Sequence, residues 1–296
     1  MTNSRIGRIS REAAFRLFWL AFVSCSGKAE DGKPVVAVSI LPQAWFVEQI
    51  AGDNVEVVPL AGPGQNLHTF EPSPRRLSEL ARADVWLLSG AEFELSLKPK
   101  IQNNFKNLVI IDTTEGVVFR SLAPNEMDGD EDVDRHSWLG REPAKTAIRY
   151  IKNSLCALDS NNAEKYQNNY ENLCAEIDAE FERLHRRLAS LEGTSVFVYH
   201  PAFGYFLDEF GVLQEAIEEG GKEPTMRSLF RLVEKAREAR PRAVFVQAQF
   251  PIAAAKTVAR SIDAEVVPLD PLAENWLENI RHMGEMLGES VVNREL

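Results

Sequence analysis

The chain has 296 residues, 45% of them hydrophobic, which allows two globular domains of about 100–150 residues each. Its 33 basic and 44 acidic side chains give a formal net charge of −11, which argues against nucleic acid and anionic membrane surfaces as partners. No apolar run reaches the roughly 18–20 residues of a membrane-spanning helix, so the sequence predicts none.

The N-terminal segment has the pattern of an export signal. Four arginines precede the short apolar run 17–23, and the small residue Ser24 and then Cys25 follow it. A basic segment, a short apolar stretch and a small residue are typical of a secretory leader. Cys25 also resembles the lipidated cysteine of a bacterial lipoprotein. We expect a leader over 1–25, a tether over 26–33, and export to the periplasm or cell surface, with a lipid anchor at Cys25 or a plain export signal as alternatives.

Strand and helix patterns alternate in the next part of the chain. Strands are predicted from runs rich in β-branched residues, at 35–40, 55–60, 85–88 and 108–111. Amphipathic spacing predicts helices around Trp45–Ala51 and around Leu77–Ala81. Strands that alternate with helices indicate a parallel sheet. We therefore predict an N-terminal α/β lobe over residues 34–160.

One apolar stripe runs along residues 161–191. Its members recur at spacings of three and four, namely Ala163, Tyr166, Tyr170, Leu173, Ile177, Phe181, Leu184, Leu188 and Leu191. A helix of about 30 residues spans roughly 45 Å, which is longer than one small domain needs. The pattern predicts a rigid helix over 161–192 that connects two lobes and ends at Gly193.

The strand and helix alternation then returns. Strands are predicted at 195–199, 243–246 and 265–269, with a helix around Leu229–Ala236 between the first two. These elements predict a C-terminal lobe over residues 193–296. The fold class is therefore α/β, with two lobes, each a mainly parallel four-stranded sheet flanked by helices, joined by one long rigid helix.

The two remaining cysteines are not expected to pair. Cys156 precedes a turn, whereas Cys174 lies well inside the following helix. At a rise of ~1.5 Å per residue this offset is too large for a disulfide. We interpret both as isolated, buried thiols.

Three histidines and one aspartate stand where a parallel α/β fold binds ligands. His68 follows the second strand in a turn-rich segment, and His200 and Asp270 directly follow strands of the second lobe. Ligands of such folds bind beyond the carboxyl ends of the strands. His136 follows an acidic segment. Three imidazoles and a carboxylate suit a borderline-soft divalent ion, although a lone histidine after a strand is more often a surface or capping residue.

Five short segments match motifs of one protein family. They are Leu67-His68-Thr69-Phe70-Glu71-Pro72-Ser73-Pro74, His136-Ser137-Trp138-Leu139, Tyr199-His200-Pro201-Ala202-Phe203-Gly204-Tyr205-Phe206, Lys222-Glu223-Pro224-Thr225 and Val267-Pro268-Leu269-Asp270-Pro271-Leu272. Together they resemble the zinc/manganese family of ABC-transporter solute-binding proteins, also called cluster A-I. The resemblance extends from about Val35 to about Leu287.

The resemblance implies that His68, His136, His200 and Asp270 bind one metal ion in the cleft between the lobes. It also implies a carrier that delivers the ion to an ABC-transporter permease in the membrane and is not an enzyme. We expect a monomer. Zinc is the predicted ion, because a mostly nitrogen ligand shell suits tetrahedral zinc. Manganese or iron is the alternative.

Two departures from the family pattern accompany these ligands. Asn66 and Gln247 stand where members of the family often carry acids. Both changes remove oxygen charge that manganese would use. The manganese-type members also tend to place a carboxylate where this chain has His200, so the sequence favours zinc.

The stretch 126–134 holds six acidic residues in nine, and two interpretations of it stay open. It could be a solvated loop, or a loop that gathers metal weakly without supplying a ligand. His185 and His282 are interpreted as structural or surface residues.

Proteins of two other classes could also hold such an ion. A zinc hydrolase needs an open coordination position and a general base, but the sequence has neither His-Glu-x-x-His nor a Gly-x-Ser-x-Gly segment. An adhesin-like lipoprotein could use the metal only to support its fold. Reversible binding by a protein that stays folded without metal would distinguish a carrier from both.

Overall fold

The computed structural model describes residues 32–292 except 123–132, 219–224, 240, 242, 248 and 251. The predicted leader with Cys25, the first seven residues of acidic stretch 126–134 and the Lys222–Pro224 part of one family motif lie outside the described residues. All helices and strands given below belong to one compact unit, Pro34–Leu296.

The first sheet consists of four parallel strands in the order β2-β1-β3-β4. They are β1 (Val35–Val38), β2 (Glu56–Pro59), β3 (Val85–Leu88) and β4 (Val109–Asp112). The connections contain α2 (Leu41–Ala51), α3 (Pro74–Leu80) and α4 (Glu92–Asn104). The predicted strands are confirmed, but β1 ends two residues early. Its apolar run continues to Ile40, which is the extended N-cap residue of α2.

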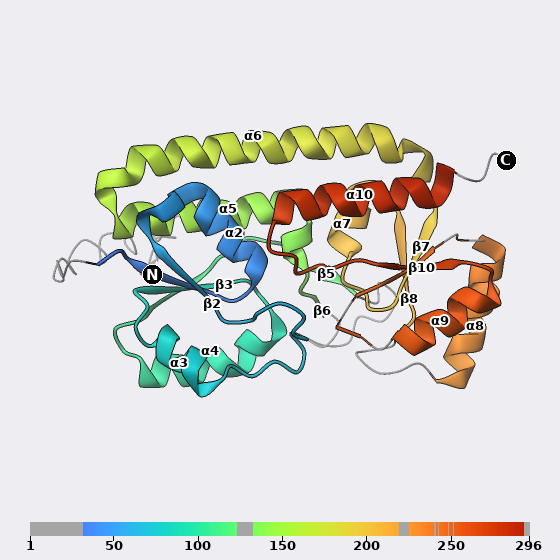
Figure 1. The fold of residues 1–296 in the computed structure, drawn as a ribbon, viewed down its shortest axis with the longest axis horizontal. Helices are drawn as coiled ribbons and strands as arrows, with labels where there is room; N and C mark the ends of the chain where they lie inside the picture. Colours follow the sequence, from blue (N-terminus) through green and yellow to red (C-terminus); the bar gives the residue numbers. More distant parts are fainter. Residues whose placement is uncertain are drawn as a thin grey trace, which may run out of the picture. The chain divides into compact units, whose positions relative to one another are not determined.

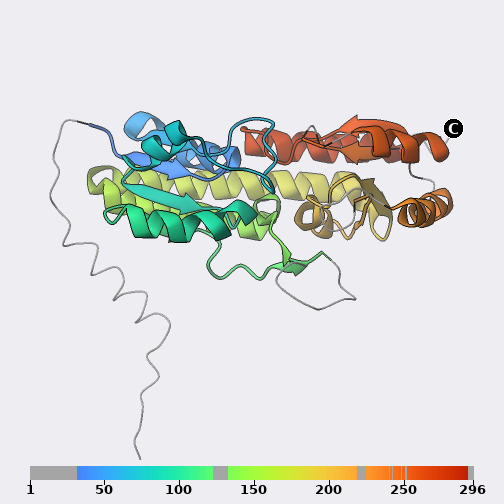
Figure 2. The same ribbon diagram turned by 90° about the horizontal axis from the view of Figure 1, so that it is seen from below.

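A short antiparallel pair, β5 (Arg120–Ser121) and β6 (Val133–Asp134), lies at the junction of the two lobes (Figure 2). The acidic stretch runs between these two strands and ends in β6. A 3₁₀ turn, Ser137–Leu139, and helix α5 (Arg141–Leu158) follow. The chain leaving β6 therefore passes directly into His136.

The long helix is α6 (Ala163–Leu188), with 3₁₀ turns Ser160–Asn162 and Ala189–Leu191 at its ends. Figure 1 shows it above both sheets, with α10 (Trp276–Val292) alongside its second half. Its predicted stripe is confirmed, since Tyr166, Ile177, Phe181 and Leu184 are fully buried. The two helices approach closely, because a Cβ atom on Gly284 would stand 2.3 Å from Cδ2 of Leu184.

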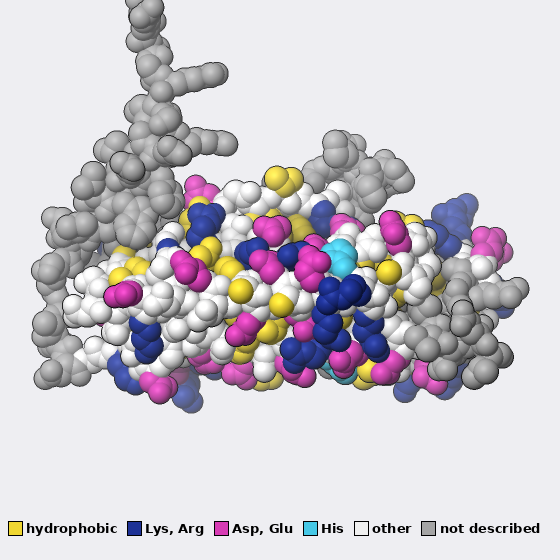
Figure 3. Space-filling model, turned by 90° about the horizontal axis from the view of Figure 1, so that it is seen from above, with side chains coloured by type: hydrophobic (Ala, Val, Ile, Leu, Met, Phe, Trp, Pro, Cys, Tyr) yellow, Lys and Arg dark blue, Asp and Glu magenta, His cyan; other side chains and the backbone are white. Residues whose placement is uncertain are grey.

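The face formed by α6 and α10 carries interspersed acidic and basic side chains (Figure 3). Glu180 of α6 accepts hydrogen bonds from Arg183 and, at 3.4 Å, from Arg281 of α10. Ion pairs on this face therefore contribute to the packing of α6 against α10.

The second sheet is also parallel, in the order β10-β9-β7-β8. Its strands are β7 (Ser195–Val198), β8 (Leu213–Ala216), β9 (Ala243–Val246) and β10 (Glu265–Pro268), and its helices are α7 (Gly204–Asp208), α8 (Met226–Ala239), α9 (Ile252–Ser261) and α10. The sequence patterns did not locate β8. It is an edge strand with two polar residues, Gln214 and Glu215, so the apolar pattern of a buried parallel strand is missing.

A shared hydrophobic core joins the two lobes. Two tryptophans add hydrogen bonds across the junction: Trp138 Nε1 donates to the carbonyl of Pro271 at 2.9 Å, and Trp276 Nε1 donates to the carbonyl of Trp138 at 2.7 Å. These bonds fix the segment after His136 against the segment after Asp270.

Cys156 and Cys174 are free, as predicted, but both side chains are partly exposed rather than buried. No helix in the described part of the chain combines the length and the apolar character that crossing a membrane requires.

Candidate metal centre

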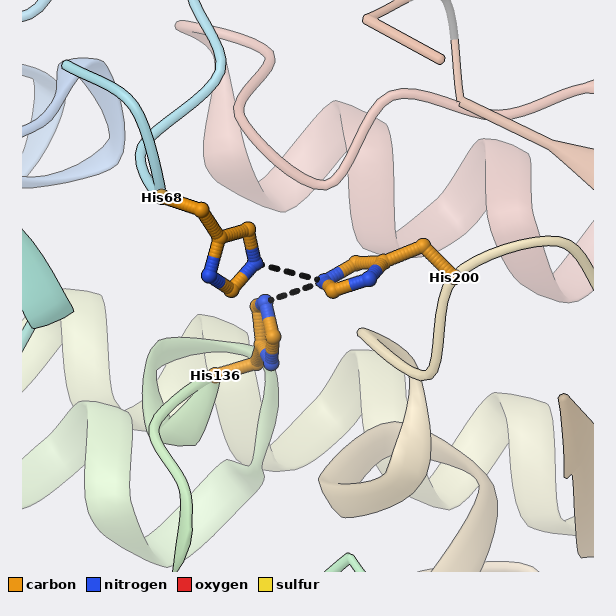
Figure 4. A group of neighbouring side chains, drawn as sticks. All are labelled: His68, His136 and His200. Carbon is orange, nitrogen blue, oxygen red and sulfur yellow. Dashed lines mark hydrogen bonds between the residues drawn. The ribbon is translucent and has the colours of Figure 1, made fainter. Parts of the chain in front are cut away.

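Three histidine side chains meet at the junction of the lobes (Figure 4). His68 comes from the loop between β2 and α3, His136 from the segment after β6, and His200 from the end of β7. Nε2 of His200 lies 3.0 Å from Nε2 of His68 and 3.2 Å from Nε2 of His136. The structure therefore brings together three of the four predicted ligands.

The spacing of these nitrogens suits a small divalent ion. Zn–N bonds of about 2.0–2.1 Å in a tetrahedral shell separate the ligand nitrogens by roughly 3.3–3.4 Å. The potential ligand atoms of the three histidines all lie within 4.8 Å of one another. The side chain of His68 is 32% exposed, whereas that of His200 is 5% exposed. An ion would therefore enter past His68 and end against His200.

Each of the three imidazoles is also bound by a carboxylate through its other ring nitrogen. Nδ1 of His68 lies 2.5 Å from Glu92, and Nδ1 of His136 lies 2.9 Å from Asp134. Nδ1 of His200 bonds to Glu218. A carboxylate only accepts, so these bonds assign the proton to Nδ1 and leave the lone pair of Nε2 for a metal.

None of these three carboxylates is predicted from the sequence. Glu92 begins α4 and Glu218 follows β8, two elements that the sequence patterns did not locate. Asp134 stands two residues before His136, and this i, i−2 spacing was the one local signal available. The other two pairs are separated by 24 and 18 residues and depend on the fold.

Burial and local hydrogen bonds shift the pKa values of two groups in this cluster, His200 and Asp134. Burial, supported by the nearby His136 and His68 imidazoles, lowers the pKa of His200 to about 4 despite its bond to Glu218. Burial alone would raise the pKa of Asp134, but hydrogen bonds from His136 and the charge of Arg120 lower it below its usual value. His200 is thus neutral at neutral pH, as a metal-binding imidazole must be, and Asp134 is ionised, as the acceptor behind Nδ1 of His136 must be.

Two polar side chains fix the backbone of the ligand loops. Asn66 Oδ1 accepts a hydrogen bond from the His68 amide at 2.9 Å. The buried amide of Gln247 accepts from the His200 N–H at 3.3 Å and donates to the His200 carbonyl at 2.8 Å. Asn66 and Gln247 therefore position the histidines, which the interpretation of these residues as lost carboxylates did not foresee.

Asp270 occupies the predicted place after β10 but is not in the histidine group. Its Oδ1 accepts from Gln249 Nε2 at 3.0 Å and from the Leu272 amide at 2.9 Å. Both bonds use the same oxygen, which leaves Oδ2 as the atom that would serve a metal. Coordination by Asp270 stays a prediction.

The two other histidines lie on helices. Nε2 of His185 on α6 lies 3.3 Å from Glu209, and His282 is exposed on α10. Neither belongs to the histidine group, the only such group of potential ligands found among the described residues.

The chain resembles proteins that are named for metal binding. Residues 36–289 match the family model described as "Zinc-uptake complex component A periplasmic". A crystal structure of ZnuA is 30% identical, with a TM-score of 0.81 over 87% of this chain and 99% of that one. The zinc-binding lipoprotein AdcA of Streptococcus pneumoniae serotype 4 is 25% identical over 90% of this chain and 55% of its own length. The manganese ABC transporter substrate-binding lipoprotein PsaA of Streptococcus anginosus is 26% identical over 88% and 89%.

The low pKa of His200 predicts how the stability of the metal-free protein depends on pH. Between pH 6.5 and about 4 the unfolded chain binds a proton at this residue and the folded chain does not. The free energy of unfolding should therefore fall as the pH is lowered through this window, by on the order of 2 kcal/mol from His200 alone between pH 7 and pH 5. Urea unfolding in chelator at pH 7 and pH 5 measures it. His200→Gln should show a smaller pH dependence than wild type, whereas His282→Gln should keep the wild-type dependence; equal slopes in all three would contradict the prediction.

Proposed function

Since this chain belongs to the family of the periplasmic component A of zinc-uptake complexes, we propose that it binds one zinc ion through His68, His136 and His200. Members of this family are substrate-binding proteins of metal ABC transporters and not enzymes. A carboxylate oxygen of Asp270 completes the proposed shell. The zinc hydrolase considered above therefore has no support.

The convergence of three Nε2 atoms carries the proposal of zinc. Raw affinity follows the Irving–Williams order at most sites, so geometry and ligand type have to decide between metals. Three imidazoles and one carboxylate give a compact shell rich in nitrogen, which suits tetrahedral zinc. Manganese prefers more oxygen ligands. A manganese or iron carrier remains the alternative, because PsaA is named for manganese.

The second part of the proposal is delivery to a membrane permease. The histidines come from both lobes, so the bound ion lies at their junction. The hydrophobic core and the two tryptophan bonds join the lobes through contacts that use none of the four proposed ligands. This supports a protein that stays folded when it releases the ion, as a carrier must, and argues against a metal that only supports the fold.

The zinc proposal predicts the outcome of competition calorimetry with zinc and manganese. Wild type should prefer zinc, and each of His68→Ala, His136→Ala and His200→Ala should lower zinc affinity at least tenfold, about 1.4 kcal/mol. His200→Ala should cost more than Asp270→Ala, because Nε2 of His200 stands between the other two nitrogens. His282→Ala is the control. A preference for manganese, or unchanged zinc affinity after loss of one of the three histidines, would overturn the proposal.

We also propose that Cys25 anchors the exported protein through a lipid. The Ser24-Cys25 sequence after the short apolar run supports this, and AdcA and PsaA are named lipoproteins. Cys25→Ser should then move the protein from the membrane fraction to the soluble exported fraction. An unchanged membrane fraction would rule out the anchor.

A further inference from the structure

An arginine of the first lobe forms ion pairs in both lobes. Arg120 of β5 donates from Nη1 to Asp134 Oδ2 at 2.9 Å. The same guanidinium contacts Asp208 of α7, in the second lobe, through Nη2 at 3.1 Å and Nε at 2.8 Å. Asp134 is fully buried, whereas the side chain of Asp208 is half exposed. Arg120 thus connects a buried carboxylate of one lobe to a helix of the other.

The first turn of α7 has the shape needed to seat this arginine. A Cβ atom on Gly204 would stand 1.3 Å from Arg120 Nη1, so no other residue leaves the guanidinium in place. The next residue, Tyr205, accepts a hydrogen bond from the Arg120 amide at 2.9 Å and donates one to the Asp134 carbonyl at 3.0 Å. Gly204 and Tyr205 belong to the family motif that contains His200. Their contacts with Arg120 and Asp134 give both residues a role of their own in the structure.

Asp134 divides its two oxygens between the arginine and the metal centre. Oδ2 is bonded to Arg120, and Oδ1 accepts from the backbone amide of His136 at 3.0 Å and lies 2.9 Å from its Nδ1. Nη1 of Arg120 makes one bond to Oδ2, and Nη2 and Nε of the same planar guanidinium lie against Asp208, so the position of the donor to Asp134 is fixed. With Oδ2 held, Oδ1 is directed at His136.

We propose that Arg120 is a positioning residue of the metal centre. It holds the His136 imidazole in place through Asp134, and its contact with Asp208 links Asp134 to α7 of the second lobe. The inference rests on the proposed function, because it concerns the same site. Asp208 pairs with the guanidinium of Arg120, and Gly204 leaves the space that the guanidinium occupies. Metal binding through His136 therefore depends on a contact between the lobes that no metal ligand makes.

The test measures metal binding to Arg120→Gln, Gly204→Ala and Arg141→Gln. Arg141 is a matched control: its side chain is 19% exposed against 25% for Arg120, and it pairs with Asp178 and, at 3.6 Å, with Glu209 near α7. It makes no contact with Asp134 among the described ion pairs. Gly204→Ala keeps both charges, but its Cβ would stand 1.3 Å from Arg120 Nη1 and 2.9 Å from Asp134 Oδ2. It therefore disturbs the geometry of the Arg120–Asp134 pair without removing either charge.

Zinc competition, zinc release to a chelator and the absorption spectrum of the Co²⁺-loaded protein are the three readouts. Loss of support behind a metal-ligating histidine typically costs 10–100-fold in affinity. Arg120→Gln should lose zinc affinity within that range, with most of the loss in faster release, and its cobalt spectrum should change. Gly204→Ala should change in the same direction, and Arg141→Gln should match wild type.

Wild-type affinity and cobalt spectrum in Arg120→Gln would overturn the inference, as would an equal loss in Arg141→Gln. If Arg120→Gln does not fold, an unchanged Gly204→Ala overturns it instead. A wild-type protein that binds neither zinc nor cobalt would overturn the proposed function itself, so the two failures are distinguishable.

Discussion

The structure of the metal centre depends on one repeated contact, a carboxylate bound to Nδ1 of each histidine. Glu92, Asp134 and Glu218 each fix the ring that they contact and leave its Nε2 as the donor. Without these contacts an imidazole could rotate about its side-chain torsions or present the other nitrogen. With these contacts, the Nε2 atoms of three histidines from three separate loops converge on one site. The net charge of the supporting acids also offsets the charge of an incoming divalent ion, which a cluster of neutral imidazoles alone would not do.

The carboxylate–Nδ1 bonds can position the imidazoles only if the loops that carry the histidines are themselves fixed. Gln247 holds the backbone of His200, and Asn66 holds that of His68. The bonds from Trp138 to Pro271 and from Trp276 to Trp138 hold the segment after His136 against the second lobe. Above the junction, α6 packs along both lobes, and its close approach to α10 at Gly284 leaves little room for one lobe to rotate against the other. The frame therefore favours small adjustments of loops over a large movement of one lobe against the other.

Much of the fold could be predicted from local patterns, because apolar strands and the stripe of α6 report burial directly. The missed elements lack that signal: β8 is a polar edge strand, and α4 contains Pro99 in its interior, a residue typical of helix ends. The three histidines could be predicted because each stands in a specific motif. Glu92 and Glu218 could not, since their contacts cross 24 and 18 residues of chain and follow from the two missed elements. The contribution of Arg120 needs three segments to be placed together, which no spacing in the sequence indicates.

The central claim is that the three carboxylates determine which nitrogen of each histidine binds the ion. Long-range ¹⁵N–¹H correlation spectra of the imidazole rings in the zinc-loaded protein test this most directly, because protonated, bare and metal-bound ring nitrogens resonate at different shifts. The account predicts three rings, those of His68, His136 and His200, with protonated Nδ1 and metal-bound Nε2. The rings of His185 and His282 should not respond to zinc. Coordination through Nδ1 at any of the three, or fewer than three metal-bound rings, would contradict it.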